Sequence, residues 1–339
     1  MNSIVHYTLC PVCGSSSINP VLSVNDYTVS GKNFSIWQCT DCSLRFTQDV
    51  PDMNTIGDYY KSEDYISHTN TSKGLINRLY KITRKKTLRQ KRKLVCKETG
   101  KKQGSLLDVG SGTGAFVKEM KQNGWQVIGL EPDAEARKIA KETFNCELKN
   151  TDELFHLPAN SFDAITLWHV LEHVHDLHKY LEQLKKLLQP SGRLIVAVPN
   201  YTSFDASTYK EDWAAYDVPR HLYHFSPVSM KLLIEKAGMK ISGYRPMWFD
   251  SFYVSLLSSK YKNAGLPPFA DADSRRPKPM ASDEAKAQAS GKSALAGDAW
   301  PDRQGRTKWF SAILNGLISN LEAMSDTKKC SSVIYIISK

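Results

Sequence analysis

The sequence has 339 residues and lacks any apolar run close to the ~18 residues that a helix needs to cross a bilayer. Its first residues also lack the basic stretch followed by an apolar stretch that is typical of a secretory signal. Hydrophobic residues make up 41% and charged residues 24%, close to the average of soluble globular proteins. These features argue against a membrane bundle, a fibre and a wholly disordered chain, and the cytoplasm is the expected location.

Cysteine is scarce, with seven residues, yet four of them form two C-x-x-C pairs. The pairs are Cys10 with Cys13 and Cys39 with Cys42, separated by 25 residues. In a chain of this length without a secretion signal, such pairs predict metal binding before disulfides. Two thiolates from each of two tight turns make a tetrahedral set with no open position, so we expect a structural zinc ion in a ribbon-like domain over residues 1–50. The alternative is four reduced thiols without a metal.

An excess of positive charge is lacking outside one segment, although the formal net charge is +10. Residues 73–102 hold thirteen Lys or Arg and one acid, Glu98, which leaves a balance of −2 for the rest of the chain. Apolar residues recur at helical spacing from Leu75 to Tyr80, so we predict a basic amphipathic helix within a linker over 51–103. The basic side of this helix would be exposed to solvent, bind an anionic acceptor, or bind RNA phosphates.

Strands and helices alternate regularly after residue 104. This alternation predicts an α/β fold with a mostly parallel sheet and helices on both faces. Predicted strands lie at 105–109, 126–130, 162–168 and 193–198, and predicted helices at 115–123, 134–143, 177–188 and 229–237. Two late strands are predicted at 240–244 and 332–338, with a helix at 309–324 before the second.

The α/β pattern is interrupted by residues 264–305, which contain almost no β-branched or aromatic side chains. Such a segment cannot bury enough apolar area to offset the entropy of ordering it. We therefore predict a disordered or loosely helical insertion there. It divides the α/β domain into residues 104–263 and a C-terminal helix and strand over 306–339.

The segment Leu107-Asp-Val-Gly-Ser-Gly-Thr-Gly114 closes the first predicted strand. Glycines allow a sharp turn and a close approach to a ligand. The loop satisfies the dinucleotide pattern G-x-G-x-x-G/A, but Asp108 just before it would repel a pyrophosphate and suits a ligand with a positive charge. Glu131 ends the next strand, where a carboxylate can accept both ribose hydroxyls. Together these features describe a site for S-adenosylmethionine, a cationic sulfonium nucleoside.

With this loop, residues ~104–260 and the last strand resemble a class I S-adenosylmethionine-dependent methyltransferase, in the group related to ubiquinone-biosynthesis O-methyltransferases. Val127-Ile-Gly-Leu-Glu131, Ser161–His173 and the Gln189-Pro-Ser-Gly192 turn also support the likeness. The resemblance implies a Rossmann-like sheet whose last strand is antiparallel. It implies that the loop holds the methionine part of the cofactor, Glu131 the ribose, and Thr151 or Asp152 the adenine. The expected cofactor residues are Asp108, Gly110, Ser111, Gly112, Gly114, Glu131, Asp152 and Trp168.

Histidines gather after the strands at 162–168 and 193–198, where an open α/β sheet places its site. Methyl transfer to a hydroxyl needs an in-line nucleophile and a base. The leading base candidate is His221, in the aromatic segment 213–225. We expect that segment to form a lid over the acceptor, and the alternative is a packed surface loop.

A second group of candidates, His169, Glu172 and His173, would share one face of a helical turn. His169 and His173 are further candidates for catalysis, as a base or as metal ligands, and the alternative is that Glu172 and His173 brace the loop. The resembled ubiquinone-type enzymes bind a divalent metal through an acid-x-x-Glu-His cluster here. This chain has His169 in place of the first acid.

The sequence thus predicts a methyltransferase whose acceptor is a small molecule, such as a hydroxyl on a sugar, lipid or other biosynthetic intermediate. The alternative is an RNA methyltransferase that holds RNA with its zinc domain and basic helix. The chain lacks the Asn/Asp-Pro-Pro-Tyr type tetrapeptide that base-amino methyltransferases carry after the strand at 162–168. A binding module without activity and a dehydrogenase are further alternatives, and the oligomeric state is left open.

Overall fold

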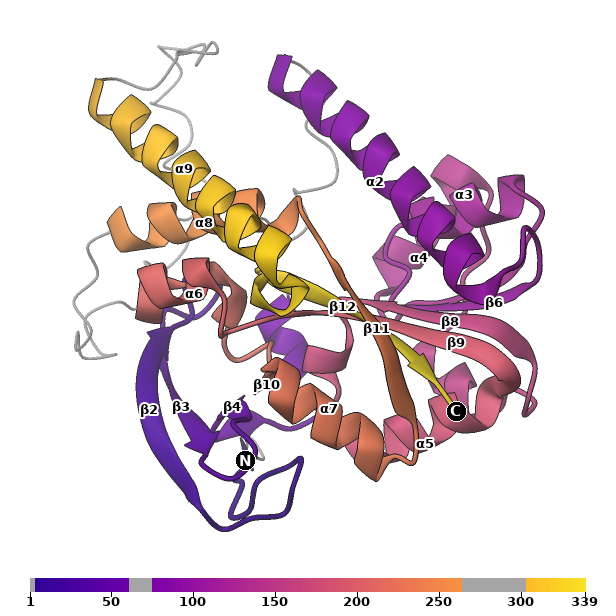
Figure 1. Ribbon diagram of the computed structural model, residues 1–339, viewed down its shortest axis with the longest axis horizontal. Coiled ribbons are helices and arrows are strands. Elements are labelled where there is room, and N and C mark those ends of the chain that lie inside the picture. Colours follow the sequence, from indigo (N-terminus) through magenta and orange to yellow (C-terminus); the bar gives the residue numbers. More distant parts are fainter. Residues whose placement is uncertain (1–3, 61–74, 264–302) are drawn as a thin grey trace, which may run out of the picture.

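The computed structural model describes residues 4–60, 75–263 and 303–339 (Figure 1). The predicted insertion at 264–305 lies almost wholly outside these residues, and its last three residues begin a helix. The centre of the described chain is a six-stranded sheet with the order β11-β12-β9-β8-β6-β7. Its strands are β6 (Ser105–Val109), β7 (Gln126–Leu130), β8 (Phe162–Trp168), β9 (Leu188–Pro199), β11 (Lys240–Pro246) and β12 (Ser332–Ser338).

The sheet has the direction pattern that the sequence predicts. Strands β7, β6, β8 and β9 are parallel neighbours, whereas β12 runs antiparallel to both β9 and β11. The fold class, a Rossmann-like mostly parallel sheet with an antiparallel last strand, is therefore confirmed. The predicted turn at 189–192 differs, because β9 begins at Leu188 and includes it.

Helices cover both faces of the sheet. Alternate side chains of a strand point to opposite faces, so Leu106 packs with α2 and α3 while Leu107 packs with α5 and α7. The first face carries α2 (Leu75–Thr99) and α3 (Ala115–Gln122), with α4 (Ala134–Phe144) beside α3. The second face carries α5 (Leu177–Leu187) and α7 (Pro227–Lys236) (Figure 1).

The N-terminal residues form a smaller sheet that shares a strand with the rest of the chain. Strand β10 (Tyr223–His224) pairs antiparallel with β4, so this sheet has the order β10-β4-β3-β2. Buried Leu44 and Phe46 pack in one core with Leu222 and Phe225. The N-terminal strands are β1 (Ile4–Val5), β2 (Ile18–Asn25), β3 (Asn33–Cys39), β4 (Arg45–Thr47) and β5 (Val50–Pro51), and β1 pairs with β5.

Helices α8 (Asp250–Asn263) and α9 (Arg303–Ser325) pack against each other as a hairpin (Figure 1). Both contact α6 (Phe204–Tyr209). Helix α9 begins six residues before the predicted start at 309. Short 3-10 turns complete the described chain: η1 (Ile56–Tyr60), η2 (Thr151–Phe155), η3 (Leu171–His173), η4 (Lys210–Asp212), η5 (Ala214–Tyr216) and η8 (Thr327–Lys329). Among the described residues, none of the helices has the length and apolar character that crossing a membrane requires.

Candidate functional site

The predicted cofactor residues converge at the carboxyl ends of the parallel strands. Asp108 on β6 is in register with Gly129 of β7 on one side and with Thr166 of β8 on the other. Glu131 follows β7 directly, and Trp168 ends β8. The sheet therefore brings side chains from three separate segments of the sequence to one edge.

The glycine loop lies tightly against its neighbours at one position and faces open space at another. Gly110 has a φ of +71°, and a Cβ there would lie 2.4 Å from Val170 Cγ2. Gly112 has a φ of +52° and no atom within 4 Å of the position of a Cβ. The first glycine thus permits close packing, and the second leaves room at the tip of the loop.

Glu131 ties the loop to the next strand. Its carboxylate accepts a hydrogen bond from Gly112 N at 2.7 Å and from Asp133 N at 3.1 Å. Burial raises the pKa of Glu131, while the two backbone hydrogen bonds act in the opposite direction. A carboxylate has about four acceptor positions. Glu131 therefore keeps acceptor capacity for further donors beside the open tip of the loop.

Asp108 is a buried acid with a single hydroxyl partner on the neighbouring strand. Thr166 Oγ1 donates to Asp108 Oδ1 at 2.7 Å. Burial raises the pKa of Asp108 to about 6, in spite of the hydrogen bonds it accepts and the charge of Lys91. The ionised form is thus poorly solvated and suits a cationic ligand.

Lys91 of α2 is a site residue that the sequence analysis did not identify. Its Nζ lies 4.3 Å from the centre of the Trp168 ring, and its charge acts on both Asp108 and Asp250. Burial lowers the pKa of Lys91. Within a run of thirteen basic residues, nothing in the sequence distinguishes the one that faces the site.

The remaining predicted cofactor residues are Ser111, Gly114 and Asp152, which differ in their contacts and exposure. Ser111 Oγ donates to the backbone oxygen of Asp108 at 2.9 Å. Gly114 precedes α3 in a left-handed conformation. Asp152 is exposed on η2, which follows the bridge between Leu130 and Lys149.

His169 is not on a common helix face with Glu172 and His173, because its φ of +59° places it before the 3-10 turn η3. It still contacts Glu172, with Nδ1 3.3 Å from Glu172 Oε1, and its Nε2 lies 2.8 Å from Asp250 Oδ2. Burial alone would lower the pKa of His169, but the two carboxylates raise it to about 10. His169 is therefore a paired cation at neutral pH.

His173 and His221 form an edge-to-face pair, with ring centres 4.6 Å apart. His173 Nδ1 donates to the backbone oxygen of Arg220 at 2.9 Å, and His221 Nδ1 donates to that of Ala215 at 2.8 Å. Each ring thus keeps its Nε2 lone pair. Burial, together with the repulsion that a protonated His221 would add, lowers the pKa of His173 to about 4, so this imidazole is neutral at neutral pH.

Glu172 lies beside the two histidines and is fully buried. Among the described residues its Oε2 has no hydrogen-bond partner. Burial would raise the pKa of Glu172, but the hydrogen bond and charge of His169 lower it. Glu172, His173 and His221 each offer one ligand atom, and these atoms lie within 4.8 Å of one another. The cluster can therefore exchange protons or hold a cation.

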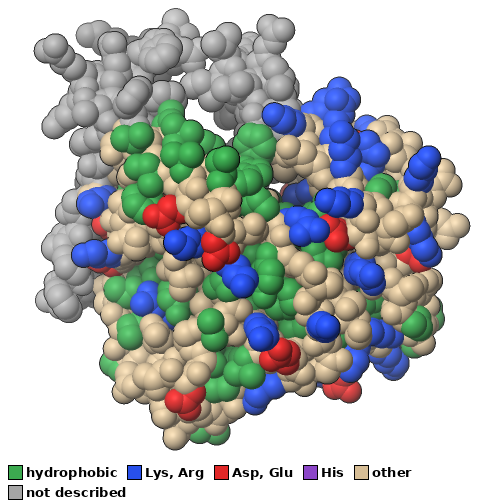
Figure 2. All heavy atoms as spheres, in the orientation of Figure 1, with side chains coloured by type: hydrophobic (Ala, Val, Ile, Leu, Met, Phe, Trp, Pro, Cys, Tyr) green, Lys and Arg blue, Asp and Glu red, His purple; other side chains and the backbone are tan. Residues whose placement is uncertain are grey.

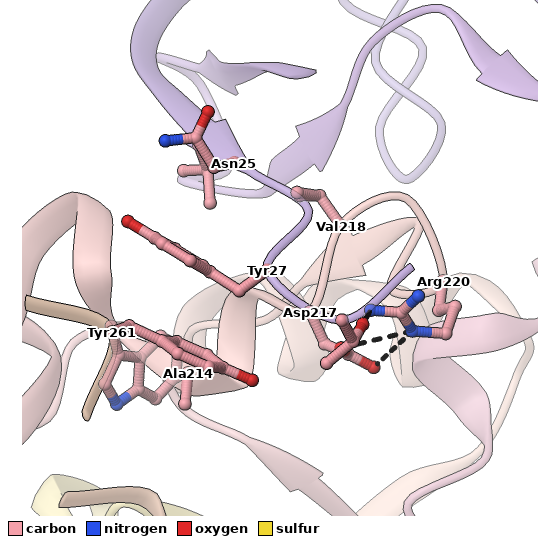
Figure 3. Close-up of a pocket in the computed structure, with 10 residues that line it drawn as sticks. Asn25, Tyr27, Ala214, Asp217, Val218, Arg220 and Tyr261 are labelled. Carbon is pink, nitrogen blue, oxygen red and sulfur yellow. Dashed lines mark hydrogen bonds and ion pairs between the residues drawn. The ribbon is translucent and has the colours of Figure 1, made fainter. Parts of the chain in front are cut away.

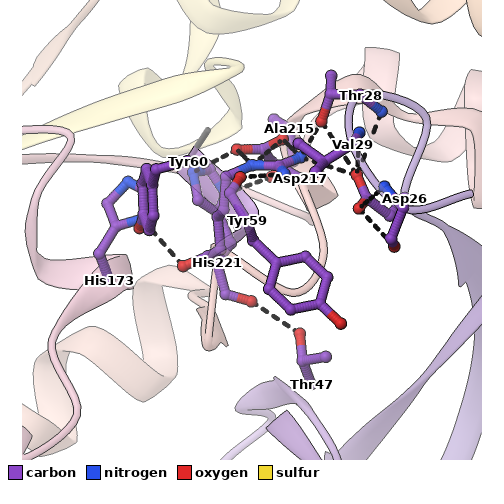
Figure 4. Close-up of polar contacts among 12 residues, drawn as sticks. Asp26, Thr28, Val29, Thr47, Tyr59, Tyr60, His173, Ala215, Asp217 and His221 are labelled. Carbon is purple, nitrogen blue, oxygen red and sulfur yellow. Dashed lines mark hydrogen bonds and ion pairs between the residues drawn. The ribbon is translucent and has the colours of Figure 1, made fainter. Parts of the chain in front are cut away.

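The backbone of His221 is held by the N-terminal sheet (Figure 4). Thr47 Oγ1 donates to His221 O at 2.7 Å, and Thr47 N donates to Leu222 O at 2.9 Å. In the segment 213–225 all residues except Asp217 are buried. The segment is therefore packed between the two sheets, and the structure shows neither an exposed lid nor a surface loop.

Arg220 links the same segment to the start of the chain. It is buried and contacts Asp217 Oδ1 at 2.6 Å, Asp26 Oδ1 at 3.2 Å and Tyr59 O at 2.9 Å. Figure 3 shows Arg220 beside a hollow of about 10 Å³, a water-sized space lined in part by the stacked rings of Tyr27 and Tyr261. The hollow is too small for an acceptor, and the network is a joint between the two parts of the chain.

The four predicted zinc ligands come together. Cys10 Sγ lies 3.5 Å from Cys42 Sγ, Cys13 Sγ lies 3.5 Å from Cys39 Sγ, and all four lie within 4.8 Å of one another. Four thiolates at Zn–S distances of about 2.3 Å are separated by about 3.8 Å in a tetrahedron. The donor set and its size therefore fit a closed zinc site.

Residues 80–242 match a family described as a methyltransferase domain. The chain is therefore similar to methyltransferases over just under half of its length. An uncharacterized methyltransferase from Alkaliphilus oremlandii (strain OhILAs) is 35% identical over 115 residues, 33% of this chain and 52% of that protein. The human mitochondrial ubiquinone biosynthesis O-methyltransferase is 27% identical over 163 residues, 43% of this chain and 44% of that protein.

The chain spans about half the length of these two curated relatives. A crystal structure of an S-adenosylmethionine-dependent methyltransferase from Archaeoglobus fulgidus is 17% identical with a TM-score of 0.44, over 76% of this chain and 94% of that one. The matched residues 80–242 contain the predicted cofactor set and both histidine segments of the methyltransferase domain.

Proposed function

We propose that the protein is an S-adenosylmethionine-dependent methyltransferase that acts on a small-molecule acceptor. The observation that supports this most directly is the placement of Asp108, Gly112 and Glu131 at one sheet edge, with open space at the loop tip. A buried acid suits the cationic methionine part, and a carboxylate with spare acceptor positions suits the ribose. The residues present thus fit the cofactor.

Calorimetry with S-adenosylmethionine tests the cofactor assignment. Glu131→Gln should weaken binding about 30-fold, since two hydrogen bonds each lose about 1 kcal/mol when the acceptor becomes neutral. The matched control is Glu135→Gln, an exposed acid of α4 that pairs with Lys138. The absence of S-adenosylmethionine binding by the wild-type protein would contradict the proposal.

The bound cofactor supplies the activated methyl group, and the protein's own residues place the acceptor and remove its proton. We assign the base to His221, whose Nδ1 is fixed by Ala215 O. Its Nε2 can accept a proton and lies 3.9 Å from the carboxylate of Asp217, which can stabilise the resulting charge. Neutral His173 and the carboxylate of Glu172 lie beside it and can stabilise the imidazolium that forms. His169 is already a cation, so we assign it to holding Glu172.

The base assignment has a direct kinetic test. His221→Gln should lower turnover about 10²–10⁴-fold, the usual contribution of a general base, and leave cofactor affinity unchanged. His156→Gln, at an exposed histidine of the same domain, is the control. A metal role for the cluster predicts instead that a divalent cation restores activity after chelation. Unchanged turnover in the His221 variant excludes it as the base.

A hydroxyl on a sugar, lipid or other biosynthetic intermediate remains the proposed acceptor. We also propose that the cysteine cluster holds structural zinc, supported by its four-thiolate donor set. A cofactor-consumption screen against nucleotide sugars, lipid intermediates, phenols and total RNA tests the acceptor class. Turnover with RNA alone would favour RNA methylation over the small-molecule assignment.

A further inference from the structure

The hairpin of α8 and α9 packs through small and polar side chains. Helix α9 turns Ala312, Ser319 and Ala323 inward, and all three are buried. Gly316 lies so close to α8 that a Cβ would come within 2.9 Å of Phe252 Cδ1. Helix α8 contributes the buried serines 251, 255 and 258. The inner face of this hairpin therefore buries little large apolar surface.

The large apolar side chains of α9 point outward instead. Leu314, Leu317, Leu321 and Met324 are 49%, 45%, 63% and 73% exposed. Their spacing of three, four and three residues places them on one stripe. A helix at the surface of a globular protein normally turns such a stripe toward the core. Helix α9 does the opposite, with its large apolar side chains toward solvent and its small side chains toward α8.

One more apolar group extends this surface toward the rest of the molecule. Trp248, 37% exposed, precedes α8, and Asn320 Nδ2 of α9 donates to its backbone oxygen at 3.0 Å. We call Trp248 and the four outward residues of α9 the hairpin surface. Contiguous exposed apolar patches of this kind mark interaction sites.

A basic stripe lies beside the hairpin surface. Lys85, Arg89, Lys93 and Lys97 of α2 are exposed and recur every four residues, so they share one side of the helix. Helix α2 approaches the residue before α8, because Lys86 Nζ lies 5.9 Å from the centre of the Phe249 ring. In Figure 2 hydrophobic side chains gather over α8 and α9, and Lys and Arg side chains over α2 on the same face.

We propose that the hairpin surface and the basic stripe together dock the protein on an anionic lipid bilayer. Small residues inside and leucines outside are typical of helices that contact lipid. An interfacial helix inserts its apolar side into the headgroup boundary while neighbouring cations attract anionic lipid. Neither contact involves Asp108, Glu131 or His221, so the docking is independent of the proposed methyl transfer.

Sedimentation with vesicles tests the docking. We expect the full chain to bind phosphatidylglycerol-containing vesicles and to bind pure phosphatidylcholine vesicles far more weakly. Lys85→Gln, Arg89→Gln and Lys93→Gln combined should weaken binding about 100-fold, since each cation near an anionic surface contributes about fivefold. The control combines Lys231→Gln of α7 and Lys240→Gln at the start of β11, two exposed lysines outside the basic stripe.

The apolar contribution has its own pair of variants. Leu317→Ser with Leu321→Ser should weaken binding about tenfold or more, whereas Val21→Ser with Val228→Ser, at exposed valines elsewhere, should not. Circular dichroism shows that each variant is folded. Equal binding to both vesicle types, or unchanged binding by the folded leucine variant, overturns the proposal. A wild-type dimer that the leucine variant dissociates would instead assign the hairpin surface to a second copy.

Discussion

Replacing Asp108 by Asn should separate the stability of the protein from its affinity for the cofactor. Asp108 is 1% exposed, and the Thr166 hydroxyl donates to its carboxylate across the sheet. An Asn amide oxygen can accept that same hydrogen bond, so the local contacts are retained. The substitution removes the negative charge, which burial disfavours and which the cationic cofactor would need.

The pKa of this group sets the size and the sign of the stability effect. Burial raises the pKa of Asp108 from 3.8 to about 6, and one pKa unit corresponds to about 1.4 kcal/mol. The native state therefore binds this proton more tightly than the unfolded state, and stability is lost as the pH rises from about 4 through about 6. At pH 7.5 the ionised side chain costs up to about 3 kcal/mol, which Asp108→Asn should recover.

Urea denaturation at pH 7.5 and pH 4.5 measures this effect. We expect the variant to be more stable than wild type at pH 7.5, with a much smaller difference at pH 4.5, and to bind S-adenosylmethionine about tenfold or more weakly. Asp163→Asn is the control of opposite sign, because Asp163 pairs with Lys101 and accepts from Ser105 N, contacts that lower its pKa against the effect of burial. A gain for Asp108→Asn that does not depend on pH would refute the reasoning.

Three further substitutions test other parts of the structure. Gly110→Ala should destabilise the protein by about 1–3 kcal/mol in urea, because it places a Cβ against Val170 at a φ of +71°; wild-type stability would show that the loop has another conformation. Cys42→Ser should lower bound zinc, measured by mass spectrometry of the metal, whereas Cys96→Ser outside the cluster should not; equal zinc in both would disprove the site. Asp250→Asn should lower the pKa of His169 in an NMR titration, since the Asp250 carboxylate is the main group that raises it; an unchanged pKa would mean that the two side chains do not interact in solution.

Four of the six strands of the central sheet could be predicted from the sequence to the residue, whereas β9 begins five residues before its predicted start. β6, β7, β8 and β12 have the predicted bounds, because buried parallel and central strands are short apolar runs between clear turn signals. The positions of Asp108 near the end of β6 and of Glu131 directly after β7 could be predicted for the same reason. Their roles toward a cofactor stay a prediction.

The parts that could not be predicted depend on contacts between distant segments. His169 pairs with Asp250, 81 residues away, and its left-handed backbone conformation has no signal in the sequence. The pairing of β10 with β4 joins segments more than 170 residues apart. The local sequence of residues 213–225 therefore did not indicate that this segment is buried between the two sheets. An aromatic and polar composition fits a lid and an interface equally well.

The joint between the two sheets has a consequence for the proposed zinc site. Thr47 holds the backbone of His221, and Asp26 pairs with Arg220, so the N-terminal residues position the proposed base. Asp108 and Glu131 belong to β6 and the end of β7, which take no part in the N-terminal sheet. Local disorder of the cysteine cluster should therefore displace the proposed base, His221, before it disturbs the proposed cofactor residues. A partial loss of zinc that lowers turnover before it lowers cofactor affinity would show this coupling, and a loss of both in parallel would contradict it.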